Sequence, residues 1–269
     1  MTVSHTSSDG HSRQVELELV GHSGSAAPFT RRLAAQTKME ASMTLKRGES
    51  LLLTLGIPIV LLVFFAEVHI LPASTKKPID FLSPGILALA VMSTSMVSLG
   101  IATGFERSYN VLKRLGTTPL GRPALIASKI AAVLLVEIVQ AVILVLVALA
   151  LGWKPSGNAG EAVIVIILGT ASFSGIGLFL AGTLKAEVNL AVANGLYLLL
   201  LLMGNMIIPV SRFPSWMATL AKALPAAALS TGLFHSLNHS SPVPAWAWLV
   251  LIAWTIAAPV AAAISWKWE

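Results

Sequence analysis

The chain has no cysteine and few charged residues. Without cysteine it can form no disulfide, carry no thiol nucleophile and offer no cysteine ligand to a metal. Only 11% of its 269 residues are charged and 55% are hydrophobic, whereas soluble domains carry about 25% charged residues. A soluble fold of this size could not keep so much apolar surface away from water, so lipid must be the solvent for much of the chain.

Motifs that carry chemistry are also missing. The segment Gly116–Pro123 has the glycine spacing of a phosphate-binding loop, but Arg and Pro stand where a Lys-Ser/Thr pair would hold phosphate and Mg²⁺. His235 and His239 lie one helical turn apart without a third metal ligand. The net charge of +6 comes with no basic patch interleaved with aromatic residues, so nucleic acid is not an expected partner. We expect no catalytic residue, no metal site and no cofactor bound by this chain.

The N-terminal part divides into two segments. Residues 1–27 are polar and have no apolar core of a signal peptide, which predicts a disordered tail. Residues 28–50 mix apolar and basic residues, which is typical of an amphipathic helix lying on the cytoplasmic leaflet. Its apolar face is imperfect, because it is interrupted by Gln36, Glu40 and Thr44, so a soluble helical linker is the alternative.

Six later segments are apolar and about as long as the roughly 20 residues of helix that cross a bilayer. Continuous runs such as 141–151 lack the polar stripe of a soluble surface helix. The sequence therefore predicts an all-α membrane protein whose transmembrane domain covers residues 51–269. The predicted spans are 51–71, 84–104, 125–151, 161–184, 190–209 and 245–266.

The distribution of positive charge predicts the orientation. Most of the 18 Lys and Arg residues fall on one side if the spans alternate, namely in the N-terminal region and in the connection between the second and third spans. Because Lys and Arg are enriched in cytoplasmic loops, both termini are expected in the cytoplasm.

Two polar or proline-rich stretches between the spans are unusual. In the first, residues 105–120, the apolar residues Phe105, Tyr109, Leu112 and Leu115 recur at helical spacing among charges. This predicts a short cytoplasmic helix that begins at Phe105, ends before Gly116 and Pro119, and packs on headgroups or a soluble partner. In the second, 205–245, prolines break helices that are too apolar for a free loop. Short helices in the outer interface fit this stretch, and an ordinary loop with one amphipathic helix is the alternative.

Two polar side chains lie inside the third predicted span. Glu137 is near its middle, and Gln140 follows on the same helical face. An embedded carboxylate costs roughly 2.5–3.5 kcal/mol, so it should face the bundle or a water-filled path. A substrate-path or inter-helix contact and a protonated carboxyl bonded to a neighbouring helix both remain open. Gly100 and Gly104 form a GxxxG pair, which predicts close helix packing, including a contact between two copies.

The two unusual stretches carry a specific resemblance. Glu106-Arg107, Leu112, Leu115 and Thr118-Pro119-Leu120 resemble the segment after the second span of ABC-2 type exporter permeases, and Lys129 opens the third span as in that family. The stretch from Asn205 through Pro225 resembles that family's proline-rich segment after the fifth span. The nearest subfamily is the drug-resistance, daunorubicin-type permeases.

The resemblance implies a function and a set of site residues. It implies a permease in the cell membrane that exports an amphipathic drug, lipid or glycan-lipid, as a homodimer or with a paralogue. Two cytoplasmic ATPase subunits would bind ATP and Mg²⁺. An ion-coupled carrier and a membrane scaffold subunit are the alternatives. Residues implied in coupling to the ATPase are Glu106, Arg107, Tyr109, Leu112, Lys113, Arg114 and Leu115. Residues implied in the re-entrant segment are Pro209, Pro214, Trp216 and Pro225.

Overall fold

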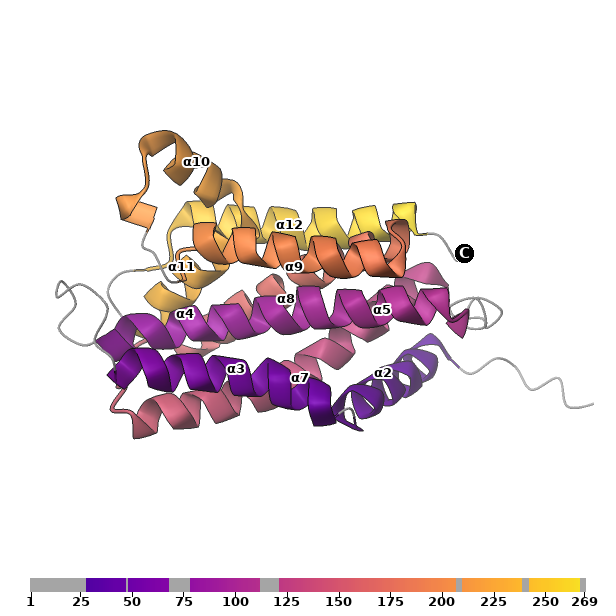
Figure 1. Ribbon diagram of the computed structural model, residues 1–269, viewed down its shortest axis with the longest axis horizontal. Coiled ribbons are helices and arrows are strands. Elements are labelled where there is room, and N and C mark those ends of the chain that lie inside the picture. The colour runs from indigo at the N-terminus through magenta and orange to yellow at the C-terminus, as the bar shows by residue number, and fades with distance from the viewer. Residues whose placement is uncertain are drawn as a thin grey trace, which may run out of the picture.

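The computed structural model describes residues 28–46, 48–67, 78–111, 121–206, 210–238 and 242–266, and every regular element in these ranges is a helix. This confirms the all-α class for the described ranges, while the predicted tail 1–27 lies outside them (Figure 1). The elements are α2 (Phe29–Lys46), α3 (Gly48–Glu67), α4 (Pro78–Met92), the π-helix η1 (Ser93–Ser98), α5 (Leu99–Ser108), α7 (Arg122–Ala150), α8 (Ala159–Thr183), α9 (Ala186–Met203), the 3-10 helix η2 (Val210–Arg212), α10 (Ser215–Ala223), α11 (Pro225–Asn238) and α12 (Ala245–Ser265).

Five helices of the described chain are long and apolar enough to cross a bilayer. They are Ile79–Ser108, Pro123–Ala150, Ala159–Thr183, Ala186–Met203 and Ala245–Ser265. The apolar part of α3, Thr54–Glu67, is shorter, and its predicted span continues to Leu71, outside the described residues. The pair α10 and α11 is bent by 85° and would bring the number to six if counted as one span. The described part of the chain therefore has five to six candidate spans.

The central elements are α8 and the rod formed by α4, η1 and α5. In Figure 1, α4 and α5 lie end to end along the length of the bundle. The rod is 67% buried over its most apolar window, against 22% for α9 and α12. Helix α8 packs on α5, α11 and α12. A Cβ at Gly175 would lie 2.5 Å from the nitrogen of Pro259, so α12 can approach α8 this closely only because residue 175 is glycine.

The two glycines of the GxxxG pair, Gly100 and Gly104, pack against other helices of the same chain. A Cβ at Gly100 would lie 3.0 Å from the carbonyl oxygen of Gly177 in α8. The side-chain amide of Asn189 in α9 donates to the carbonyl of Gly100 at 2.8 Å, and it also lies against Gly104. The predicted close packing is therefore present, and its partners are α8 and α9 of the same chain.

The outward faces of α7, α9 and α12 are apolar. A helix exposed to water would carry polar residues on such a face. The large apolar side chains exposed there include Leu135, Ile138, Val142 and Leu146 of α7, Leu198, Leu199 and Leu202 of α9, and Leu249, Ile252, Ile256 and Val260 of α12.

We call the end of the bundle where α4 begins the Pro84 end. Here α4, α11 and the loop before α8 lie close enough for main-chain carbonyls to accept hydrogen bonds from neighbouring elements. Pro84 has no N–H, so the carbonyl of Asp80 loses its helical donor. The side-chain amide of Asn238, at the end of α11, donates to that carbonyl at 2.6 Å. The loop before α8 joins the same helix end, since the N–H groups of Gly157 and Asn158 donate to carbonyls of α11 at 3.0 and 2.7 Å.

The bent pair α10 and α11 forms a hairpin in one half of the bundle. The indole of Trp254 donates to the carbonyl of Ala223 at 3.1 Å, about 14 Å along α12 from its first residue. Leu229 lies against Gly169, about 15 Å along α8 from its start. Ser236 reaches the first turn of α8. Helix α11 therefore begins inside the bundle and ends at the Pro84 end.

Candidate functional site

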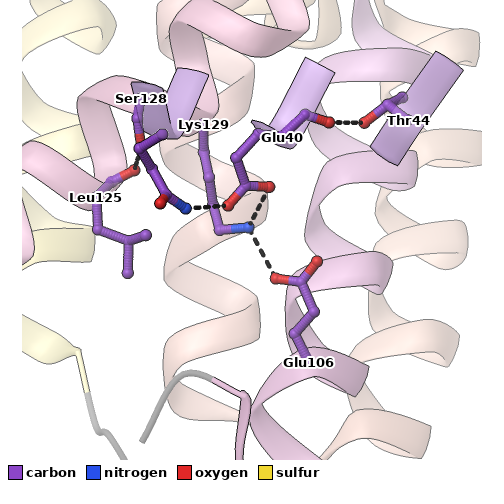
Figure 2. Close-up of polar contacts among 7 residues, drawn as sticks. Glu40, Thr44, Glu106, Leu125, Ser128 and Lys129 are labelled. Carbon is purple, nitrogen blue, oxygen red and sulfur yellow. Dashed lines mark hydrogen bonds and ion pairs between the residues drawn. The ribbon is translucent and has the colours of Figure 1, made fainter. Parts of the chain in front are cut away.

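A buried ion-pair cluster lies at the opposite end of the bundle, which we call the Lys129 end. The ammonium of Lys129 in α7 lies 3.0 Å from Oε2 of Glu40 in α2 and 2.8 Å from Oε2 of Glu106 in α5. The lysine side chain is only 1% exposed. Figure 2 shows both carboxylates converging on this one ammonium from two different helices. We call these three residues the Lys129 cluster.

Helix α2 presents a polar face to the cluster. Gln36, Glu40 and Thr44 are spaced by one helical turn, so they share one side of α2. The amide of Gln36 donates to Oε1 of Glu40 at 3.0 Å, and the hydroxyl of Thr44 donates to the main-chain carbonyl of Glu40 at 3.0 Å. The bond from Gln36 fixes the carboxylate, which a buried ion pair requires because desolvation otherwise cancels the attraction.

This cluster corrects two interpretations of the sequence. The predicted orientation counts Lys129 among the cations of the connection between the second and third spans, but its side chain is buried inside the bundle. The polar residues regarded as flaws in the apolar face of residues 28–50 are the face that α2 turns toward α7. Their regular spacing is the signal in the sequence that α2 has a second, polar face.

A cavity of about 640 Å³ opens beside the Lys129 cluster. Its wall is formed by α2, α3, η1, α5, α7 and α9, and all three residues of the cluster line it. The remaining lining is mixed, since hydroxyl and amide groups such as those of Thr94 and Asn194 alternate with aliphatic side chains. The hydroxyl of Thr103 is buried at this wall and has no hydrogen-bond partner in the described part of the chain. Such a lining suits a molecule with both apolar and polar parts.

Two irregular helical segments in the cavity wall are joined by Gln140. Pro58 interrupts the hydrogen bonding of α3 and leaves the carbonyl of Thr54 without its helical donor. The amide nitrogen of Gln140 donates to that carbonyl at 2.6 Å. Its amide oxygen accepts from the hydroxyl of Thr94, in the π-helix, at 2.9 Å. Gln140 is thus an inter-helix contact that satisfies a carbonyl freed by proline.

Glu137 faces a different neighbour. It is 3% exposed, and the hydroxyl of Thr170 in α8 donates to its Oε2. Its Oε1 has no hydrogen-bond partner among the residues that the structure describes. The geometry is an inter-helix contact between α7 and α8, and Glu137 does not line the cavity beside the Lys129 cluster. A role in a substrate path stays a prediction.

The residues predicted to couple to an ATPase separate into two groups. Glu106 belongs to the Lys129 cluster, and the guanidinium of Arg107 donates to the carbonyl of Ala181 in α8 at 2.8 Å. Both side chains therefore bind within the bundle. Tyr109 is 72% exposed and stacks on Phe105. Leu112, Lys113, Arg114 and Leu115 lie outside the described residues.

The predicted start of a separate helix at Phe105 is wrong. Residues 105–108 are the last turn of α5, which continues through Gly104, and the helix ends in a turn at Tyr109 and Asn110. Asn110 has a φ of 59°, a left-handed conformation that asparagine tolerates and that commonly ends helices.

The proline-rich stretch folds as two short helices. Pro214 precedes the first residue of α10, and Pro225 is the first residue of α11, positions where a missing N–H costs nothing. Pro225 is buried, whereas Trp216 is 65% exposed. Pro209 lies outside the described residues.

Comparison with known proteins gives the class. Residues 33–238 match the family described as ABC-2 type transporter, so the chain belongs to this family. Together with its five or more apolar helices, this makes it a multi-pass membrane protein. A relative named "Putative transport permease YvfS" from Bacillus subtilis (strain 168) is 24% identical over 235 residues, covering 82% of this chain and 91% of the relative. The chain is therefore a transporter permease subunit.

Proposed function

We propose that the chain is the membrane subunit of an ATP-binding-cassette exporter that moves an amphipathic drug, lipid or glycan-lipid outward. ATP and Mg²⁺ bind to separate cytoplasmic ATPase subunits, and a second permease copy completes the pathway. The chain performs no catalysis itself. Membership of the ABC-2 type transporter family supports this proposal, as does a cavity of mixed polarity within the spans.

The observation that carries the proposal is the position of Glu106. It lines the cavity and pairs with Lys129, and it lies in the last turn of α5, directly before the connection that would contact the ATPase. A displacement of this connection would therefore move a wall of the cavity. Arg107 links the same turn to the end of α8, so the displacement would also reach the centre of the bundle.

The proposed topology has six spans, with both termini in the cytoplasm. Helix α3 is the first span, and the Lys129 end is the cytoplasmic end. The hairpin of α10 and α11 is then a re-entrant segment of the outer leaflet, which is supported by its 85° bend and by the buried positions along α11. Irregular backbone is tolerated at this depth only where protein surrounds it.

The test is reconstitution with the ATPase encoded nearest to this chain. We expect ATP-dependent transport in liposomes and stimulation of ATP hydrolysis by an amphipathic substrate. Tyr109→Ala should reduce both by about tenfold or more, as expected when an anchoring aromatic residue is removed from an interface. Trp216→Ala removes an aromatic residue of similar exposure at the other end of the bundle and should change neither.

Two outcomes would contradict the proposal. One is substrate transport by this chain alone, driven by an ion gradient, which would identify a secondary carrier. The other is a stable complex with no transport at all under ATP, which would favour a scaffold. Tyr109 suits this experiment better than Glu106 or Arg107, because the latter two also hold helices together. Since Tyr109 also lines the cavity, binding of the substrate to the variant is measured without the ATPase and should be unchanged.

A further inference from the structure

The exposed face of α2 carries charge of one sign. Helix α2 contains one carboxylate, that of Glu40, and this group is buried in the Lys129 cluster. Arg31, Lys38 and Lys46 are exposed, as are the apolar side chains of Phe29, Met39, Met43 and Leu45. The ion pair thus removes the only negative charge from the outer surface of the helix. A cationic and apolar surface is complementary to an anionic membrane leaflet.

A groove follows this face between α2 and α7. It has a volume of about 660 Å³, and its walls include Leu33, Ala41 and Leu45 of α2 and Leu135 of α7. Lys38 and Lys46 are its charged residues, and no carboxylate lines it within the described chain. Leu135 lies about 20 Å along α7 from its first residue, next to the exposed apolar side chains that continue along the span.

We infer that this groove binds one anionic phospholipid of the bilayer. The lysines contact the phosphate and the net negative headgroup, and an acyl chain lies along Leu45 and Leu135 toward the exposed face of α7. A zwitterionic lipid offers the same phosphate, but it brings an ammonium next to the lysines. A free anion would leave the apolar part of the groove empty, so the charge and the apolar wall together specify a lipid.

The bound lipid would also hold α2 against the cavity. Lys38 and Glu40 are two residues apart in the chain and therefore point to opposite faces of α2. The lipid binds the face of Lys38, while Lys129 binds Glu40 on the other face. Met43 and Thr44, in the next turn, line the cavity. Without the lipid, the ion pair of Glu40 with Lys129 would be the main polar contact that holds α2 in the cavity wall.

Native mass spectrometry of the purified full chain tests the site. The chain is equilibrated in detergent that contains phosphatidylglycerol, or phosphatidylcholine with the same acyl chains. The detergent is then removed in the spectrometer, and the lipids that stay bound are counted. We expect one phosphatidylglycerol to be retained preferentially. Lys38→Gln with Lys46→Gln should weaken its retention by about fivefold per lysine, or about thirtyfold together. Lys154→Gln with Lys222→Gln removes the same charge from exposed positions elsewhere and should leave retention unchanged.

Three results would overturn the inference. They are equal retention of the two lipids by the unmodified chain, equal loss in both double variants, and displacement of the lipid by millimolar inorganic phosphate, which would show a site for free anions. Hydrogen exchange in nanodiscs gives a second readout. Amides of α2 should exchange more slowly with phosphatidylglycerol than with phosphatidylcholine, and the Lys38→Gln, Lys46→Gln variant should lose the difference. Neither measurement needs an ATPase, so this inference and the proposed exporter function can fail separately.

Discussion

The Pro84 end and the Lys129 end are held together by different interactions. At the Pro84 end, main-chain hydrogen bonds and the close approach at Gly157 join α11 to the loop before α8, and the side-chain amide of Asn238 joins α11 to α4. At the Lys129 end, α2, α5 and α7 meet through charged side chains beside a cavity. Main-chain contacts between closely packed helices allow one arrangement, because a small displacement breaks several at once. Long charged side chains keep their contacts over a wider range of helix positions, so we expect the contacts of α2 with α5 and α7 to tolerate larger displacements than those at the Pro84 end.

The largest loss of unfolding free energy is expected when the ion pairs of the Lys129 cluster are removed. Lys129→Met leaves the buried carboxylate of Glu40 and the half-buried carboxylate of Glu106 without their cation and should destabilise the chain by about 3 kcal/mol. Thermal or SDS unfolding in detergent measures this. Changing all three residues together, as Glu40→Gln, Lys129→Met and Glu106→Gln, should restore most of the loss, because no unpaired charge remains. If the triple variant is as unstable as Lys129→Met, packing rather than charge accounts for the cluster.

The Pro84 end can be tested by adding one methyl group. A Cβ at Gly157 would collide with the carbonyl of Ser236, and main-chain atoms there cannot move aside. Gly157→Ala should therefore cost about 1–3 kcal/mol of unfolding free energy. Gly195→Ala is the control, since nothing lies within 4 Å of its added Cβ. If Gly157→Ala leaves the unfolding free energy unchanged, the main-chain contacts at the Pro84 end can shift to make room for a methyl group.

The carbonyls freed by proline occur at both ends and allow a direct comparison. Gln140→Leu removes the hydrogen bonds to the carbonyl of Thr54 and from the hydroxyl of Thr94. Asn238→Leu removes those to the carbonyl of Asp80 and from the indole of Trp153. Each lost partner should cost about 1–3 kcal/mol. Pro58→Ala restores the missing N–H in α3, so in a double-variant cycle it should recover the part of the Gln140→Leu cost that comes from the carbonyl of Thr54, but not the part that comes from the hydroxyl of Thr94. An additive cycle would mean that Gln140 does not act through the carbonyl of Thr54.

The smallest effect is expected at Glu137. Glu137→Gln keeps a group that can accept from Thr170 and should change stability by less than about 0.5 kcal/mol. Transport assays then separate the two interpretations of this residue. Normal transport indicates an inter-helix contact, and a large loss with normal stability indicates a charge used in the substrate path.

The helices could be predicted from hydropathy, because each long apolar run must satisfy its own main chain in lipid. The turn at Asn110 was missed, since the apolar spacing continues through it and only a left-handed residue interrupts the helix. The partners of Lys129 could not be predicted either. Glu40 is far from it in the chain, and local periodicity does not contain pairings between distant helices. The spacing of Gln36, Glu40 and Thr44 showed a polar face without showing what it contacts.

The π-helix η1 has a consequence for how the rod of α4 and α5 could move. A π-helical turn accommodates one residue more than an α-helical turn, and one residue corresponds to about 100° of rotation about the axis. If η1 rewound as α-helix, α5 would rotate by about that angle relative to α4. Glu106 would then turn away from Lys129, while Pro84 and the packed end stayed in place. Such a rotation would also separate Met96 and Gly100 from Gly177 of α8, so the glycine packing opposes it and keeps η1 in its place in the wall of the cavity.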